Sequence, residues 1–115
     1  MKIYISGPIS GQPTEQVTSH FNNAEKRLKK LGYQVINPLN TPPLNIPQTP
    51  EQQWVEYMKA DIIQLMHSDA IYMLEGYQNS KGAFLEYMIA VQLEMPITYE
   101  HNSDKELTDF ISPLL

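Results

Sequence analysis

Two carboxylates lie inside stretches of this sequence that are otherwise mostly apolar. Glu86 is the only acidic residue of the segment 79–90, and Asp61 adjoins Ile62 in a second apolar stretch. A charge placed against a protein core is costly unless it is paired or used. Either side chain could instead face water on a helix surface. For Asp61, the spacing supports an internal position and a water-facing position equally. If both are internal, they form a pair able to act as nucleophile and general acid–base.

Two glycine-bearing loops follow predicted strands and could hold the substrate of such a pair. The segment 6–11 carries two serines and two glycines after the apolar run 2–5, and its N–H groups and hydroxyls suit a phosphate or a sugar. This pattern is weak by itself because tight turns require glycine anyway. In the second loop, 75–82, the last residue is Gly82, which would leave open space one turn before Glu86.

Alternating strand and helix patterns position these residues. Runs of β-branched and aromatic residues predict strands, and apolar residues at spacings of three and four predict helices between them. Thr49 as N-cap, Pro50 at the first helical position and Gln52 placed to complete a capping box predict a sharp helix start. We expect strands near 2–6, 34–36, 70–74 and 96–99, and helices near 14–31, 50–67 and 82–94 and from 103 onward.

This alternation predicts one α/β domain spanning residues 1–115. Strands that alternate with helices imply right-handed crossovers and a parallel sheet. We expect a three-layer fold of the Rossmann-like or flavodoxin-like kind, with four to five strands in the order 2-1-3-4(-5). Ligands of such folds bind at the topological switch, outside the carboxyl ends of the strands. The loops 6–11 and 75–82 and the side chain of Glu86 should therefore converge on one crevice.

Composition argues against several classes of function. The chain has 115 residues and a formal net charge of -5, which disfavours a general nucleic-acid binder. It contains no cysteine, no run near the ~20 apolar residues of a membrane span, and an N-terminal apolar run too short for a signal peptide. We expect a soluble cytoplasmic protein with no nucleic-acid or membrane partner, no metal and no cofactor. The basic residues Lys26, Arg27, Lys29 and Lys30 are expected to form a solvated face.

Five motifs between about residues 2 and 99 carry a family resemblance. They are Tyr-Ile-Ser-Gly-Pro-Ile-Ser-Gly at 4–11, Val-Ile-Asn-Pro at 35–38, Met-Lys-Ala-Asp at 58–61, Ser-Asp-Ala at 68–70 and Asn-Ser-Lys-Gly-Ala-Phe-Leu-Glu at 79–86. In this order they resemble the nucleoside 2-deoxyribosyltransferase superfamily, and more closely its short branch, the DUF4406 domain. The shared order makes the match more specific than any single motif.

The resemblance implies a catalytic pair and a pocket for a small nucleoside or nucleotide. Glu86 matches the nucleophile of the family, and Asp61 matches the acid that assists it. The first glycine loop matches the lining of the sugar or phosphate pocket. The substrate-binding residues implied in this way are Tyr4, Ser6, Gly7, Pro8, Ile9, Ser10, Gly11, Asn37, Pro38, Asp69, Ser80, Lys81 and Gly82.

The implied reaction is cleavage or exchange of an N-glycosidic bond. A carboxylate attacks the anomeric carbon of a deoxyribose and displaces the base, which gives a covalent glycosyl-enzyme. A second acid protonates the departing base and then deprotonates an incoming base or water. An incoming base makes the enzyme a transferase and water makes it a hydrolase, and the sequence leaves both open.

Ser80 is a departure from the nucleoside transferases, which carry an acid six residues before the nucleophile. A serine at this position resembles the deoxynucleoside 5′-monophosphate N-glycosidases of the same superfamily, in which it contacts phosphate. Lys81 adds a positive charge, and Ser6 and Ser10 add donors. These residues favour a nucleotide over a nucleoside, while a turn or helix N-cap role for Ser80 is nearly as well supported.

Two alternatives belong to other functional classes. The domain could bind a nucleotide or an ADP-ribose-like metabolite without catalysis, although two carboxylates would hinder the binding of an anion. It could also be an assembly domain that uses Tyr87, Met88, Val91 and Met95 as a dimer face, although such residues more often form core. We expect a homo-oligomer, a dimer or higher, because a short chain buries a limited core. Active sites of the resembled superfamily are also commonly completed by a neighbouring subunit.

Overall fold

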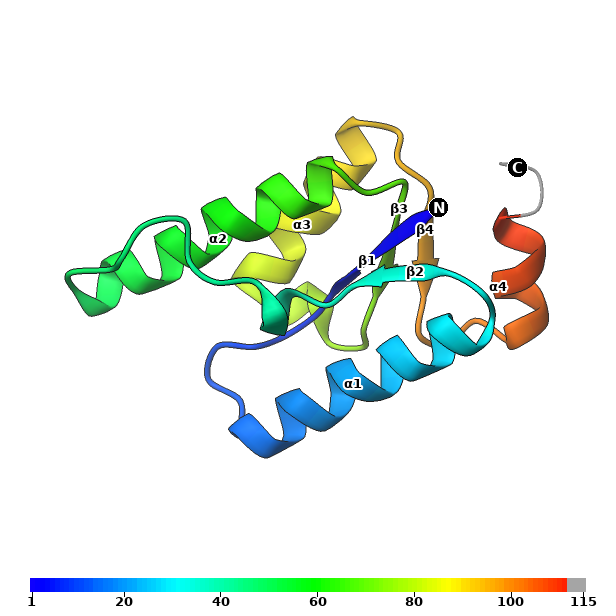
Figure 1. Cartoon of the computed structure of the whole chain (residues 1–115), viewed down its shortest axis with the longest axis horizontal. Helices are drawn as coiled ribbons and strands as arrows, with labels where there is room; N and C mark the ends of the chain where they lie inside the picture. The colour runs from blue at the N-terminus through cyan, green and yellow to red at the C-terminus, as the bar shows by residue number, and fades with distance from the viewer. Residues whose placement is uncertain (112–115) are drawn as a thin grey trace.

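The computed structural model describes residues 1–111, without the side chain of Ile111 (Figure 1). Four strands alternate with helices in this part of the chain. The strands are β1 (Lys2–Ser6), β2 (Gln34–Ile36), β3 (Ala70–Met73) and β4 (Ile97–Tyr99). The helices are α1 (Thr14–Lys30), α2 (Pro50–Met66), α3 (Lys81–Gln92) and α4 (Asp104–Ile111), with the short 3-10 helices η1 (Pro38–Asn40) and η2 (Tyr77–Asn79). None of the helices in residues 1–111 is long and apolar enough to cross a membrane.

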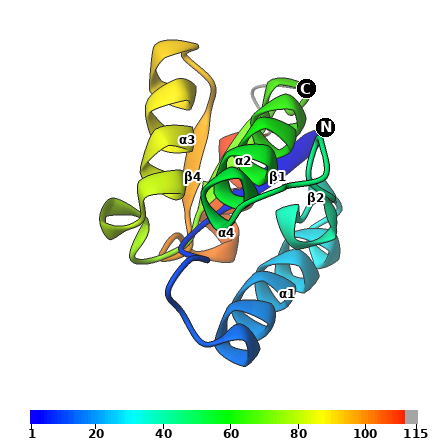
Figure 2. The same ribbon diagram turned by 90° about the vertical axis from the view of Figure 1, so that its left-hand side faces the viewer.

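The sheet is parallel throughout and has the order β2-β1-β3-β4. Tyr4 of β1 pairs with Ile36 on one side and Ile71 on the other, and Met73 of β3 pairs with Tyr99 of the edge strand. Helices α2 and α3 cover one face of the sheet, and α1 covers the other (Figures 1 and 2). The predicted three-layer α/β fold and its strand order are confirmed, with four strands and no fifth in the described part of the chain.

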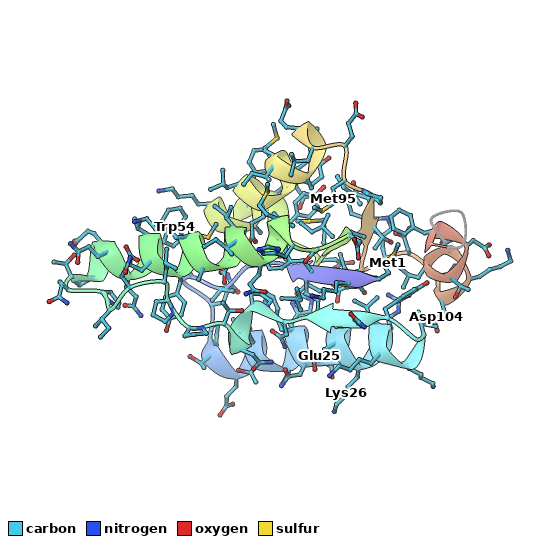
Figure 3. All side chains as sticks on the ribbon, turned by 45° about the horizontal axis from the view of Figure 1, so that its top comes forward. Met1, Glu25, Lys26, Trp54, Met95 and Asp104 are labelled. Carbon is cyan, nitrogen blue, oxygen red and sulfur yellow. The ribbon has the colours of Figure 1, made fainter. Side chains whose placement is uncertain are left out.

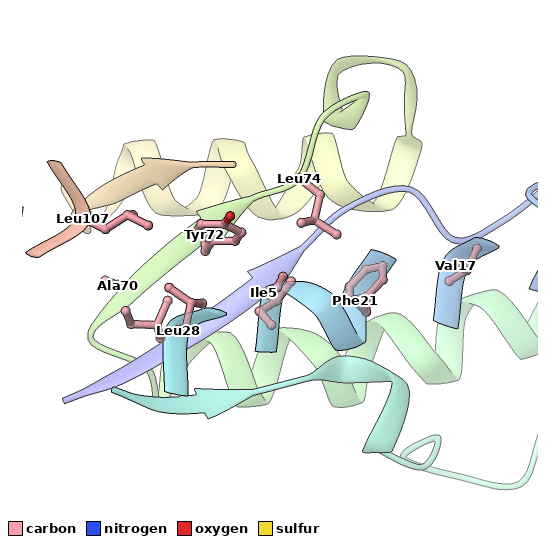
Figure 4. Close-up of a cluster of buried hydrophobic side chains, with 10 residues drawn as sticks. Ile5, Val17, Phe21, Leu28, Ala70, Tyr72, Leu74 and Leu107 are labelled. Atoms are coloured by element: carbon pink, nitrogen blue, oxygen red, sulfur yellow. The ribbon is translucent and has the colours of Figure 1, made fainter. Parts of the chain in front are cut away.

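Alternation along β1 directs its side chains to two separate cores. Ile3 and Ile5 pack with α1 residues such as Phe21 and Leu28, and this cluster also contains Leu107 of α4 (Figure 4). Tyr4 points to the opposite face and packs with residues of α2, β3 and α3. Because successive side chains of a strand face opposite ways, Ser6 lies on the same face as Tyr4. β1 thus delivers two hydroxyls to the layer of α2 and α3.

Side-chain caps fix where α2 and α3 begin. The Thr49 hydroxyl accepts from the backbone N–H of Gln52, as predicted, but the Gln52 side chain accepts from the N–H of Gln48 rather than from that of Thr49. At the start of α3, the Ser80 hydroxyl accepts from the N–H of Ala83 at 3.2 Å. Capping satisfies donors that a helix N-terminus leaves unpaired. The start of α3 is therefore set six residues before Glu86.

The basic cluster on α1 is not only a solvated face. The Arg27 guanidinium donates to the Tyr72 hydroxyl at 2.8 Å and to the backbone carbonyls of Glu100 and Asn102, and it pairs with Asp104. The expectation for Arg27 was wrong because its long side chain reaches from α1 to the end of β4. This contact fixes the chain that leads from β4 into α4.

Candidate active site

A cavity of about 650 Å³ opens at the carboxyl ends of β1 and β3. Its walls come from the loop after β1, from η1, and from α2, the loop after β3 and α3. This is the topological switch at which ligands bind in open α/β sheets, and its volume suits a small-molecule ligand. The predicted site residues that line it are Tyr4, Gly7, Ile9, Ser10, Gly11, Pro38, Asp61, Ser80, Lys81, Gly82 and Glu86.

Glu86 is buried in this cavity and held by both of its oxygens. Only 5% of the surface of this residue is exposed. The Tyr4 hydroxyl lies 2.5 Å from Oε2, and the Ser6 hydroxyl donates to Oε1 at 2.8 Å. Both donors come from the face of β1 that alternation turns toward α3. A carboxylate fixed at two oxygens keeps one orientation, which is what a nucleophile requires.

The environment of Glu86 raises its pKa to about 8, and burial is the largest cause. The hydrogen bonds from Tyr4 and Ser6 act in the opposite direction, because they stabilise the carboxylate. The negative charge of Asp61 raises the pKa further. Burial and the nearby carboxylate also raise the pKa of the Tyr4 hydroxyl well above its usual value. Perturbation of this kind in a cleft is typical of functional sites.

Asp61 lies on α2 and faces the same cavity as Glu86. The residue is 6% exposed, and its Oδ1 atom is buried without a hydrogen-bond partner among the described residues. Burial raises the pKa of Asp61 to about 7. Buried polar atoms in native proteins are nearly always hydrogen-bonded, so an unpaired one requires an explanation. A ligand atom that exchanges a proton with Asp61 would supply the missing partner.

The contact between α2 and α3 shapes the mouth of the cavity. A Cβ atom at Gly82 would lie 3.0 Å from the Met58 sulfur, so glycine keeps this approach open. The ammonium group of Lys81 lies 4.3 Å from the centre of the Trp54 ring, within the range of a cation–π contact. Trp54 projects from α2 (Figure 3). The mouth therefore combines an aromatic surface with one positive charge.

Asp69 is a correction, because the structure places it away from the cavity. Its carboxylate is exposed and accepts from the backbone N–H of Lys2 at 2.8 Å. Asp69 precedes β3, whereas the cavity opens where β3 ends. Asp69 therefore lies at the amino end of β3, where it links the start of β1 to the residue before β3.

Three further predicted residues take different positions. Asn37 is buried outside the cavity wall, where its side chain accepts from the N–H of Leu39 and donates to Asn22. It therefore caps η1 and acts on the site only through the backbone of that segment. Pro8 lines a neighbouring cavity instead. Ser6 is not in the lining but contacts Glu86 directly.

Sequence reasoning missed the wall that lies opposite the glycine loops. Trp54, Tyr57 and Met58 of α2 line the cavity, together with Phe21, Leu39, Pro50, Gln53, Asn79 and Ala83. Trp54 and Met58 share one helical stripe with Ile62 and Leu65, a spacing that indicates a buried face. Asp61 lies at the edge of that stripe. A carboxylate in this position could have indicated that the N-terminal half of the stripe faces a ligand rather than the core.

The cavity shows no metal-binding cluster. Among residues 1–111, no group of three or more histidine or carboxylate side chains is arranged to hold a metal ion.

Comparison with known proteins agrees with this fold. Residues 1–99 match the family described as a domain of unknown function, DUF4406. No curated protein matches the sequence. A solved structure described as the 2-deoxyribosyltransferase of the psychrotolerant bacterium Bacillus psychrosaccharolyticus is similar, with a TM-score of 0.64. The two chains are 23% identical, and the match covers 95% of this chain and 81% of the other. The chain belongs to the DUF4406 family and shares the fold of that transferase.

Proposed function

We propose that this DUF4406 protein breaks the N-glycosidic bond of a 2-deoxynucleoside or its 5′-monophosphate. The observation that carries the proposal is the pair of buried carboxyl groups in one cavity, one held at both oxygens and the other with an unpaired oxygen. Similarity to a structure described as a 2-deoxyribosyltransferase supports the choice of substrate class. The alternative is a protein that binds the same ligand without reaction.

In the first step, Glu86 acts as the nucleophile. One carboxylate oxygen forms a bond to the anomeric carbon as the bond from that carbon to the base nitrogen breaks. The bonding electron pair leaves with the base, and Asp61 donates its proton to the base. The products are a neutral base and a deoxyribosyl ester of Glu86, formed through an oxocarbenium-like transition state.

In the second step, Asp61 takes a proton from water or from an incoming base. The oxygen or nitrogen so activated attacks the anomeric carbon, and the ester bond to Glu86 breaks with return of its electron pair to the carboxylate. Water yields free deoxyribose or its phosphate, and a base yields a new nucleoside or nucleotide. A pKa of about 7 lets Asp61 serve as acid and then as base near neutrality.

The polar end of the cavity favours a phosphorylated ligand. Lys81 carries the only positive charge among the described lining residues, and it has no carboxylate partner. Ser10 and Ser80 lie in the same wall and can donate hydrogen bonds. A phosphate gains charge-assisted hydrogen bonds from such a set. We therefore rank deoxynucleoside 5′-monophosphates above free deoxynucleosides as substrates.

The test is an assay in which the protein is incubated with the common deoxynucleosides and their 5′-monophosphates. Chromatography measures the rate at which free base is released. Glu86→Gln should lower the rate at least about a thousandfold, because loss of a nucleophile raises the barrier by about 4 kcal/mol or more. Glu51→Gln, at an exposed position of α2, is the matched control and should react like the wild type. A second base added to the reaction distinguishes transfer from hydrolysis.

Two outcomes would reject the proposal. Base release by Glu86→Gln at a rate near that of the wild type would remove Glu86 as the nucleophile. A wild-type protein that binds a nucleotide yet never releases its base would favour the binding-protein alternative.

A further inference from the structure

A second cavity adjoins the candidate active site. It has a volume of about 320 Å³ and shares Ser10, Asn79 and Ser80 with the wall of the larger cavity. Its remaining wall comes from the loop after β1, from Glu75 and Gly76, and from the N-terminal half of α1. Helix α1 covers the opposite face of the sheet from α2 and α3 (Figure 1). The residues shared by the two cavities lie in the segments that follow β1 and β3.

The wall of this second cavity offers uncharged hydrogen-bonding groups. Ser10, Gln12, Gln16 and Asn79 line it. All four residues are exposed, and none of their side chains forms a hydrogen bond to another described residue. Free amides and hydroxyls around a cavity can bind a group that carries hydroxyls or amides of its own.

The charges around the second cavity disfavour a second phosphate. No lysine or arginine is among its lining residues in the described chain. His20 lies in the wall, but its Nε2 is 2.8 Å from both carboxylate oxygens of Glu100. Glu75 contributes a further negative charge. An anion placed here would meet two carboxylates and one histidine that is already paired, so an uncharged ligand group fits better.

The orientation of the substrate in the cavity follows from the position of Asp61, the proposed general acid. Asp61 must contact the base, and Trp54, Tyr57 and Met58 line the cavity from the same helix. The base therefore lies toward Asp61, and the far end of the sugar lies toward the N-terminus of α3, where Ser80 and Lys81 lie. Ser10 and Ser80 are at the boundary with the second cavity, because both line the two cavities. A substituent beyond the 5′ position would enter the second cavity between the two glycine loops.

We propose that the second cavity is a subsite for an uncharged, hydroxyl-rich group attached beyond the 5′ oxygen or 5′-phosphate of the substrate. The inference rests on the proposed function, since it assumes that the sugar lies over Glu86. It extends that function to a substrate class, the 5′-conjugates of deoxynucleotides with a polyol such as a sugar. In these substrates the bond to the base is broken, and the conjugated group serves for recognition only.

Calorimetric titration of Glu86→Gln, which should bind without turnover, tests the subsite. Three ligands are compared: the best-bound deoxynucleoside 5′-monophosphate, its phosphodiester with a hexose, and its phosphodiester with cyclohexanol. The hexose ester should bind about tenfold more tightly than the cyclohexyl ester, because only the hexose can pair with the free amides and hydroxyls. Michaelis constants of the wild type for the same ligands provide a second measurement.

The variant Gln16→Leu tests whether the second cavity binds the hexose. The substitution removes an amide from the wall of that cavity and places a side chain of similar size at the same exposed position of α1. It should reduce the advantage of the hexose ester about fivefold and leave the affinity for the monophosphate unchanged. Gln92→Leu makes the same change at an exposed position of α3 outside both cavities and should change neither value.

The outcomes separate the subsite from the proposed function. If the monophosphate binds and releases its base but the hexose ester gains nothing over the cyclohexyl ester, the subsite is rejected and the proposed function stands. A hexose advantage that Gln16→Leu does not reduce also rejects the subsite. If none of the three ligands binds, both are rejected.

Discussion

At the scale of single residues, the site depends on how β1 presents two hydroxyls to one carboxylate. Tyr4 and Ser6 are two residues apart on a strand, so both face α3 and contact different oxygens of Glu86. The sequence indicated Glu86 through its apolar neighbours and both hydroxyls through the resembled motif. It did not indicate that both contact Glu86, because that requires the packing of α3 onto β1.

Tyr4→Phe should lower the rate of base release near neutral pH and move the alkaline limb of the pH–rate profile to higher pH, because Glu86 has the higher pKa of the catalytic pair. The Tyr4 hydroxyl lowers the pKa of Glu86, and its loss leaves only Ser6 to stabilise the carboxylate. At pH 7 the rate of base release should fall about tenfold. Tyr57→Phe removes a hydroxyl from another wall of the cavity and is the control. An unshifted profile would show that the contact of Tyr4 with Glu86 does not tune the nucleophile.

The wild-type profile should be bell-shaped with its maximum between pH 7 and pH 8. The reactive state has Glu86 ionised and Asp61 protonated, and their pKa values are about 8 and about 7. Because the two groups interact, the limbs report the pair rather than either residue. Asp61→Asn should abolish the alkaline limb and lower the rate about a hundredfold. A leaving group that needs no proton should restore most of that rate, and its failure to do so would contradict the role of Asp61 as acid.

At the scale of secondary-structure elements, Ser80 has two roles. Its hydroxyl caps α3 by accepting from the Ala83 N–H, and it also lines both cavities. The N-cap role, which the sequence favoured almost as strongly as phosphate contact, is present in the structure. A cap and a ligand contact can coexist, because a hydroxyl oxygen that accepts from the helix can still donate its hydrogen outward.

Ser80→Asp separates the two roles. Aspartate is as good an N-cap as serine, so the stability of the fold should be unchanged. Its negative charge beside Lys81 should repel a phosphate and lower kcat/KM for a monophosphate relative to the free nucleoside by at least about tenfold. Ser80→Ala, the companion variant, should cost about 1 kcal/mol of stability by losing the cap. Unchanged preference in Ser80→Asp would mean that the phosphate lies elsewhere or does not bind.

Element boundaries and the strand order followed from the sequence, but long-range side-chain contacts did not. Strand alternation, helical spacing and the cap at Thr49 are local signals, and each helix begins within one or two residues of its predicted position. Arg27 was misassigned because its partners lie more than 40 residues away in the chain. Asp69 was assigned to the pocket from the motif match, although the predicted strand 70–74 already placed it before β3, at the end of the strand away from the switch.

At the scale of the whole molecule, the buried carboxyl groups should make stability depend on pH. The pKa of Glu86 rises from an ordinary 4.5 to about 8 on folding. A raised pKa contributes stability that is fully present below the unfolded value and is lost as pH rises through the folded value. Thermal unfolding should therefore show a decreasing melting temperature from about pH 5 to pH 8, with a loss of a few kcal/mol. Glu86→Gln should flatten this dependence and be more stable than the wild type at pH 8, and a slope equal to that of the wild type would contradict the raised pKa.

The outer face of α3 should mediate association between two copies of the chain. Phe84, Leu85, Met88 and Val91 are between 38% and 44% exposed, and they form an apolar surface beside the cavity. A small domain gains stability by covering such a surface. Light scattering at micromolar concentration should give at least twice 13.2 kDa. Met88→Lys should reduce this to the monomer, and a wild type that is itself monomeric would contradict the expectation.

The most direct test of the central claim is mass spectrometry of the protein during turnover. Wild-type protein is mixed with a deoxynucleoside 5′-monophosphate, denatured in acid within the first turnovers, and digested. We predict a peptide that carries a deoxyribosyl phosphate ester on Glu86, formed together with free base and absent from Glu86→Gln. Base released by the wild type without any such adduct, and still released by Glu86→Gln, would contradict covalent catalysis at Glu86.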